Sequence, residues 1–112
     1  MSYKSEYPVA LFNGTVATTN GLYSIEDISI TEAKKYLNHN GFESAIGHLA
    51  TAELMADVFN KDIKMNRIQY KQQIGQVAIV FKLKQRPPEG IILNRKEIED
   101  IGFNFKIMKR LK

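Results

Sequence analysis

The sequence predicts an α+β fold, a single domain over residues 1–112 with a mixed or antiparallel sheet of about five strands and helices packed on it. Two observations predict this class. Short apolar runs with strand periodicity are interspersed with segments whose apolar residues recur at helical spacing. The 112 residues are the length of one domain, and a composition that is 44% hydrophobic and 25% charged is typical of globular proteins.

The first third of the chain predicts two strands and a helix. Val9–Phe12 is a short apolar run that ends at an Asn-Gly turn signal. The stretch LYSIEDISI, residues 22–30, is rich in β-branched and aromatic residues and contains a second strand. Ser29 and Glu32 have the spacing of a capping box, so a helix begins there and ends near Gly41.

A second helix is predicted over residues 48–60, and two strands should follow it. Four residues of this helix fall at the spacing of a core-facing stripe: Leu54, Met55, Val58 and Phe59. Residues 67–72 and 76–85 read as strands, and the QQIG sequence between them predicts a hairpin. Because both faces of Val77–Phe81 are apolar, the second of these strands should be central.

The remaining residues predict a loop, a helix and a last strand. The two prolines of residues 86–90 remove two backbone donors and break regular structure. Residues 94–101 predict a short helix with Asn94 as its cap. Residues 103–111 alternate between apolar and polar side chains, which predicts a strand at the edge of the sheet.

The composition excludes several classes of protein. With no cysteine, the chain has no disulfide, thiolate zinc site or cysteine nucleophile, which fits a reducing compartment. No apolar run reaches the roughly 18 residues of a membrane span, and the N-terminus lacks the apolar core of a signal peptide. We therefore expect a cytoplasmic protein without a membrane partner, in the host cytoplasm if a phage encodes it.

The charge is unevenly distributed along the chain. Residues 1–56 carry a net charge of −3, and residues 57–112 carry +7. The C-terminal half should therefore attract anions, and phosphate-bearing partners are the usual ones. A lysine-rich surface that only keeps the protein soluble has the same signature.

No common catalytic motif is present, so candidate residues come from positions at the ends of elements. The two histidines, His39 and His48, lie nine residues apart without a second ligand at metal spacing, so we expect no metal or other cofactor. Ends of elements are where binding groups are exposed on a rigid scaffold. The polar residues there, with one in the last strand, are Asn13, His48, Arg67, Gln85, Arg86, Glu89 and Lys106.

Five of these seven residues also have an ordinary structural interpretation. His48 fits either a cap for its own helix or a half-buried histidine that is hydrogen-bonded to a carbonyl. Glu89 lies between a proline and a glycine and fits an exposed turn. Arg67 and Arg86 fit surface ion pairs, and Asn13, next to a glycine, fits a turn.

Five motifs together resemble a known family. LFNG, AIGH, KMNR, QRPPEG and NRKEIEDI occur in an order and spacing similar to those of the anti-CRISPR ring nucleases, small proteins of archaeal viruses with relatives in bacteriophages and integrated elements. The resemblance extends from about Val9 to Leu111. It implies a metal-independent homodimer that binds cyclic tetra-adenylate at its interface. The product would be linear di-adenylate with a 2′,3′-cyclic phosphate, which antagonises type III CRISPR signalling.

The resemblance also implies a role for each candidate residue. The catalytic residues would be His48 and Glu89, and the phosphate-contacting arginines Arg67 and Arg86. Further substrate contacts would come from Asn13, Gln85 and Lys106. This chain departs from the family in having only Thr15 or Thr18 where relatives carry a serine, and in carrying Pro87 and Pro88 in the loop before Glu89.

A second interpretation is a non-catalytic regulator of a mobile element that binds nucleic acid or a cyclic nucleotide. The same arginines and lysines would serve it. The two functions differ in whether turnover requires His48 and Glu89.

Overall fold

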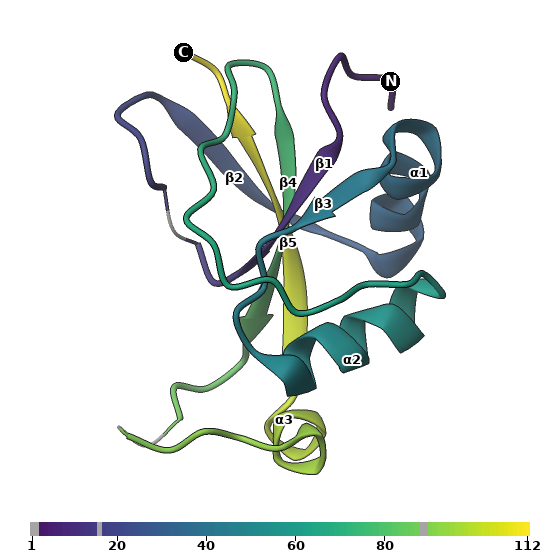
Figure 1. Ribbon diagram of the computed structural model, residues 1–112, viewed down its shortest axis with the longest axis vertical. Coiled ribbons are helices and arrows are strands. Elements are labelled where there is room, and N and C mark those ends of the chain that lie inside the picture. Colours follow the sequence, from purple (N-terminus) through teal and green to yellow (C-terminus); the bar gives the residue numbers. More distant parts are fainter. Residues whose placement is uncertain (1–2, 16, 88–89) are drawn as a thin grey trace.

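Within residues 3–15, 17–87 and 90–112, which the computed structural model describes, five strands form one mixed sheet and three helices pack on it (Figure 1). The strand order across the sheet is β2-β5-β4-β1-β3. The strands are β1 (Val9–Asn13), β2 (Tyr23–Ile28), β3 (Phe42–Ser44), β4 (Val77–Leu83) and β5 (Phe103–Arg110). The helices are α1 (Ile30–Asn40), α2 (Leu49–Phe59) and α3 (Arg95–Ile101). The predicted α+β class is confirmed.

The middle of the sheet is β4, as its two apolar faces predict. It pairs in parallel with β1 on one side and antiparallel with β5 on the other. Val77, Ile79 and Phe81 of β4 join the core beneath the helices, whereas Ala78 and Val80 belong to a second cluster on the opposite face. The prediction that β4 is central is confirmed.

The prediction that the last strand lies at an edge is wrong, because β5 lies between β4 and β2. The alternation of apolar and polar side chains along β5 has another cause. Phe105 and Ile107 pack beneath the helices, while Lys106 lies on the opposite face, which no helix in the described part of the chain covers. A sheet with only one face under helices produces the same alternation in an interior strand as in an edge strand.

The predicted strand over residues 67–72 does not form, and neither does the hairpin. In the described chain, residues 62–73 have no regular secondary structure and cross in front of the sheet (Figure 1). Buried amide side chains hold this segment in place. Gln72 donates to the carbonyl of Met108 at 2.9 Å, and Gln76 donates to the carbonyl of Pro8 at 2.8 Å. The fifth strand is β3, which pairs with the edge of β1.

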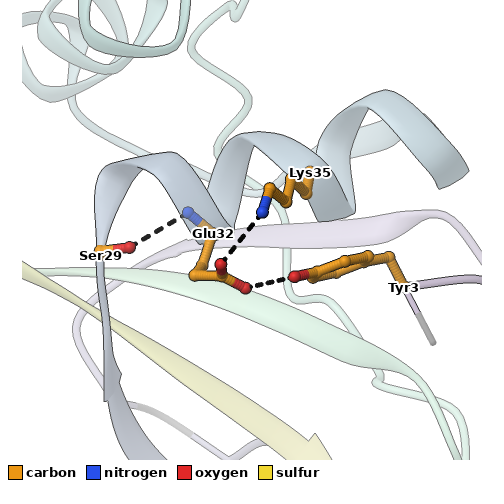
Figure 2. A network of polar contacts seen from close by, with 4 residues as sticks. All are labelled: Tyr3, Ser29, Glu32 and Lys35. Carbon is orange, nitrogen blue, oxygen red and sulfur yellow. Dashed lines mark hydrogen bonds and ion pairs between the residues drawn. The ribbon is translucent and has the colours of Figure 1, made fainter. Parts of the chain in front are cut away.

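Both capped helices begin where the sequence predicts, although the first capping box is only half formed. The Ser29 hydroxyl accepts from the Glu32 amide at 3.1 Å. The Glu32 carboxylate accepts from the Tyr3 hydroxyl at 2.5 Å and pairs with Lys35 at 3.3 Å (Figure 2). At α3 the box is complete, with Asn94 as the cap.

The network around Glu32 ties the N-terminal segment to α1 and shifts the pKa of all three ionisable members, Tyr3, Glu32 and Lys35. The hydrogen bond from Tyr3 lowers the pKa of the Glu32 carboxyl, with a further contribution from Lys35. The same bond raises the pKa of the Tyr3 hydroxyl. Asn40 adds a second tie, since its side-chain amide donates to the Tyr3 carbonyl at 2.6 Å.

Candidate functional site

A cavity of about 240 Å³ lies where α2 begins. Figure 1 shows that α2 lies toward the end of the sheet opposite the C-terminus. We call this cavity the His48 cavity. Its walls come from the ends of β1 and β4, the first turn of α2, α3 and the loop that precedes α3. The lining residues are Asn13, His48, Thr51, Phe81, Leu83, Pro87, Ile91, Ile92, Leu93 and Ile98.

His48 occupies the N-cap position of α2, but its side chain does not cap the helix. Its backbone is extended (φ −125°, ψ 125°), and its carbonyl accepts from the Ala52 amide at 3.1 Å. The imidazole makes no capping hydrogen bond to the described helix, and the residue is exposed. The capping interpretation of His48 is therefore wrong, and the ring is available to a ligand. The first amides of α2 also favour an anion at this point.

Arg67 lies beside the residue that precedes His48. A Cβ added at Gly47 would lie 3.4 Å from Arg67 Nε and 3.5 Å from Arg67 Cγ. Backbone pairing holds the two segments together, because the Asn66 amide donates to the Ile46 carbonyl at 2.8 Å. Asn66 also donates through its side chain to the Ser44 carbonyl at 2.9 Å. A permanently charged side chain thereby lies against the residue that precedes the histidine.

Asn13 is the last residue of β1 and lines two cavities. One is the His48 cavity; the other, of about 190 Å³, lies between β1 and the segment that contains Tyr70. Thr18, one of the two threonines expected to replace the family's serine, lines this second cavity, where its hydroxyl donates to the Tyr70 carbonyl. The amide of Asn13 is therefore positioned between two spaces that a ligand can enter.

The loop after β4 carries three further candidates. Gln85 and Arg86 are exposed, and Pro87 lines the His48 cavity. The root of the loop is fixed by the Lys84 amide, which donates to the Gly102 carbonyl at 3.0 Å. Glu89 and Pro88 lie outside the described residues, so the structure assigns them no place.

The structure does not bring Lys106 to this cavity. It lies in the middle of β5, opposite Val80 on the helix-free face, and its ammonium pairs with Asp27 at 2.6 Å. The structure brings Asn13 and His48 into one cavity and places Arg67 against Gly47, the residue before His48. The resemblance implies a substrate contact for Lys106, and that role stays a prediction.

Two sets of residues that line the cavity were not predicted as site residues from the sequence. Thr51 is 3% exposed and follows His48 by three residues, a spacing that places both in the first turn of a helix. That spacing could have identified Thr51 as a neighbour of His48. The apolar residues 91–93 gave no such signal, because an isoleucine-rich loop reads as an ordinary hydrophobic stretch.

An ion-pair cluster connects the two helices that wall the cavity. Arg95 of α3 pairs with Asp57 of α2 and, at 3.0 Å, with Glu99 of its own helix. Asp57 is the larger cause of the raised pKa of the Arg95 guanidinium. All three groups are partly exposed, so the cluster orients the helices more than it stabilises them.

Within residues 3–15, 17–87 and 90–112, no three histidine, cysteine, aspartate or glutamate side chains lie close enough together to hold a metal ion. No helix in that part of the chain is long and apolar enough to cross a membrane.

Comparison with known proteins identifies relatives across most of the chain. A family model described as STIV B116-like matches residues 9–105. Uncharacterized protein YddF of Bacillus subtilis (strain 168) is 32% identical over 105 residues, covering 92% of this chain and 97% of that protein. Uncharacterized protein 26 of a Sulfolobus islandicus filamentous virus is 40% identical over 80 residues, covering 70% of this chain and 68% of that protein. Uncharacterized protein ORF117 of Acidianus two-tailed virus is 37% identical over 92 residues, covering 80% of this chain and 79% of that protein.

The fold also matches a solved structure. B116 of Sulfolobus turreted icosahedral virus superposes with a TM-score of 0.65, covering 92% of this chain and 99% of that one. At 23% sequence identity this likeness shows a shared fold. The relatives thus come from archaeal viruses and from a bacterium.

Proposed function

The chain belongs to the STIV B116-like family, and from this premise we propose that it is a metal-independent ring nuclease. It would cleave cyclic tetra-adenylate into linear di-adenylate with a 2′,3′-cyclic phosphate and so antagonise type III CRISPR signalling. The observation that carries the proposal is the position of His48, exposed and uncapped at the start of α2. Asn13 lines the same cavity, and Arg67 lies against the residue that precedes His48.

The reaction needs a proton donor and not a redox group. The ribose 2′-oxygen attacks the adjacent phosphorus, the bond from phosphorus to the 5′-oxygen breaks, and a 2′,3′-cyclic phosphate remains. The departing 5′-oxygen must be protonated, and an imidazolium is the side chain best matched to that step near neutral pH. His48 would supply the proton, which is worth roughly 10²–10⁴ in rate.

The arginines would bind the phosphates of the ring. Arg67 lies next to the residue before His48, and Arg86 is exposed on the loop that leaves the cavity. A guanidinium donates two parallel hydrogen bonds to a phosphate, which orients the group as well as neutralising it. Gln85 and Asn13 would add polar contacts to the substrate.

Glu89 has two possible roles in this proposal. A carboxylate beside His48 would favour the protonated imidazole and hold it in place. A carboxylate beside the nucleophile would instead accept the 2′-hydroxyl proton. Glu89→Gln removes the negative charge and should lower the rate in both roles, so the pH profile separates them. In the first role, the pH above which activity falls should move downward, and in the second the decline of activity at low pH should disappear.

We propose a homodimer, with the ring bound between two copies. A two-fold axis matches the symmetry of a four-nucleotide ring and presents the same groups to its opposite halves. Exposed apolar residues flank the His48 cavity and would be covered by a second copy: Leu49 is 58% exposed, Ile91 52% and Ile92 80%. Apolar side chains gathered around a site mark an interaction surface.

A single-turnover assay tests the function. The purified protein is mixed with cyclic tetra-adenylate in EDTA at neutral pH, and the products are separated by chromatography. We expect linear di-adenylate ending in a cyclic phosphate, and a loss of about 10² or more with His48→Ala. His39→Ala is the matched control, because that histidine is on α1, stacked on Tyr3, and should leave the rate unchanged.

Other outcomes point to other functions. A ring that stays intact but co-elutes with the protein would replace the nuclease by a sequestering protein. A ring that is neither cut nor bound would contradict the proposal and favour a nucleic-acid-binding regulator, whose affinity should fall steeply with salt.

A further inference from the structure

The walls of the His48 cavity are mostly apolar. Seven of its ten lining residues are apolar, and none of the described ones carries a lysine, arginine, aspartate or glutamate side chain. Its deepest members, Phe81 and Ile98, are 1% and 3% exposed. A phosphate among these apolar walls, away from His48 at the mouth, would lose its hydration without gaining a cationic partner, which is unfavourable. A flat, uncharged group is the better fit.

One hydroxyl that lines the cavity makes no hydrogen bond to another described residue. It belongs to Thr51, a residue that is 3% exposed. Its oxygen is not among the fully buried unpaired atoms of the described chain, which are Gln72 Oε1 and Arg110 Nε, so the hydroxyl is accessible from the cavity. It can donate one hydrogen bond and accept two. The cavity therefore combines apolar walls with one group able to read the edge of a heterocycle.

We propose that the His48 cavity is a nucleobase pocket, in which Thr51 reads the edge of an adenine of the substrate. This inference rests on the proposed function and deepens it. Adenine presents a hydrogen-bond donor and an acceptor on one edge, and a threonine hydroxyl pairs with either. The apolar residues of β4, α3 and the preceding loop would contact the faces of the base.

The pocket places the reacting phosphate at the cavity mouth. His48 is exposed there, and Arg67 lies alongside the preceding glycine. A base held beneath α2 leaves its ribose and phosphate beside the imidazole and the guanidinium. The base would then contribute to positioning as well as to affinity, so its loss should lower kcat as well as raise KM.

The test uses single-nucleotide probes, so it does not depend on cleavage of the ring. Methyl NMR spectra of the Ile98 and Ile91 side chains are recorded with adenosine 5′-monophosphate and, separately, with ribose 5-phosphate. We expect the nucleotide to shift both methyl resonances and the base-free sugar phosphate to leave Ile98 unmoved. An equal shift with both probes would mean that the cavity takes phosphate, and an unmoved Ile98 with the nucleotide would overturn the pocket.

Variants at Thr51 test the edge-reading group. Thr51→Val keeps the shape and removes the hydroxyl, and it should weaken nucleotide binding about tenfold. Thr51→Ser should restore most of the affinity, which a role in packing would not predict. Thr31→Val, on the exposed first turn of α1, is the control and should change nothing. Unchanged binding by Thr51→Val would overturn the role of Thr51.

The two proposals fail in distinguishable ways. If the ring is cut but Ile98 does not respond to adenosine 5′-monophosphate, the nuclease stands and the base pocket is wrong. If Ile98 responds but the ring stays intact, the pocket stands and the protein is a nucleotide-binding one without turnover.

Discussion

The Arg67 side chain runs alongside Gly47, where a Cβ would lie 3.4 Å from Arg67 Nε. The two residues are twenty positions apart and meet because the Asn66 amide pairs with the Ile46 carbonyl at 2.8 Å. This contact places a guanidinium next to the residue that introduces His48. Because residue 47 has no side chain, Arg67 can pack directly against the backbone that leads into His48.

Enlarging residue 47 should displace Arg67. An alanine adds only a Cβ at ordinary contact distance, so Gly47→Ala should keep most of the activity. Gly47→Val adds methyl groups beyond that Cβ, and kcat/KM should fall about tenfold, mainly through KM. Steady-state kinetics measures the difference, with circular dichroism to show that both variants fold. Equal activity of the two would mean that the contact has no role in the site.

The planar, two-donor shape of the Arg67 guanidinium should contribute to substrate binding in addition to its charge. Arg67→Lys keeps the positive charge but loses the two-pronged donor, and we expect KM for the ring to rise about tenfold. Lys64→Ala, three residues earlier and paired only with the exposed Asp62, is the matched control and should have little effect. Full activity of Arg67→Lys would show that a point charge suffices.

The pKa of Glu32 predicts how the N-terminal tie depends on pH. Because the Tyr3 hydroxyl lowers this pKa in the folded protein, the bond stabilises the fold above the ordinary pKa of a glutamate. The contribution is lost as the pH falls through the lowered value. Tyr3→Phe should therefore lower the urea midpoint at pH 7, and the difference should shrink below about pH 4.

A control variant and a direct titration accompany the measurement of the urea midpoints. Tyr7→Phe removes a nearby hydroxyl and should show no such pH dependence. An NMR titration of the Glu32 carboxyl should move its pKa upward in Tyr3→Phe. A gap between Tyr3→Phe and the wild type that is constant from pH 7 to pH 3 would mean that Tyr3 stabilises the protein through its ring contacts alone.

The buried amide of Gln76 should be a large stability determinant. It donates to the Pro8 carbonyl at 2.8 Å and to the Tyr70 hydroxyl at 2.7 Å, and it accepts from the Gln73 amide at 2.8 Å. Gln76→Ala should lower the free energy of unfolding by about 2–4 kcal/mol, because it leaves buried partners unpaired. Gln73→Ala is the control, since residue 73 is exposed and contributes only its backbone. Similar denaturation midpoints for the two would contradict this account.

Local signals in the sequence were enough to predict the helices and the central strand. Ser29, Asn94 and Gly41 mark helix ends by their own chemistry, and the apolar run of β4 marks burial on both faces. The segment 67–72 was misread because it has β-branched and aromatic residues. Its position depends on distant groups, since the amide of Gln72 bonds the Met108 carbonyl.

The site was partly predictable for the same reason. Positions at the ends of elements identified Asn13 and His48 without any knowledge of the topology. The alternation in the last strand also predicted that Lys106 lies on the face opposite Phe105 and Ile107, and its contact with the substrate stays a prediction. The interior position of β5 and the partner of Lys106 both follow from strand pairings that a local pattern does not specify.

The central claim is that His48 protonates the departing oxygen. Its most direct test is a cyclic tetra-adenylate in which sulfur replaces the bridging 5′-oxygens. A thiolate, whose conjugate acid has a pKa of about 8.5, leaves without the help that an alkoxide needs. In single-turnover assays, His48→Ala should slow cleavage of the natural ring by about 10² or more and that of the sulfur ring by less than about threefold. An equal loss on both rings would contradict the assignment of His48 as the general acid.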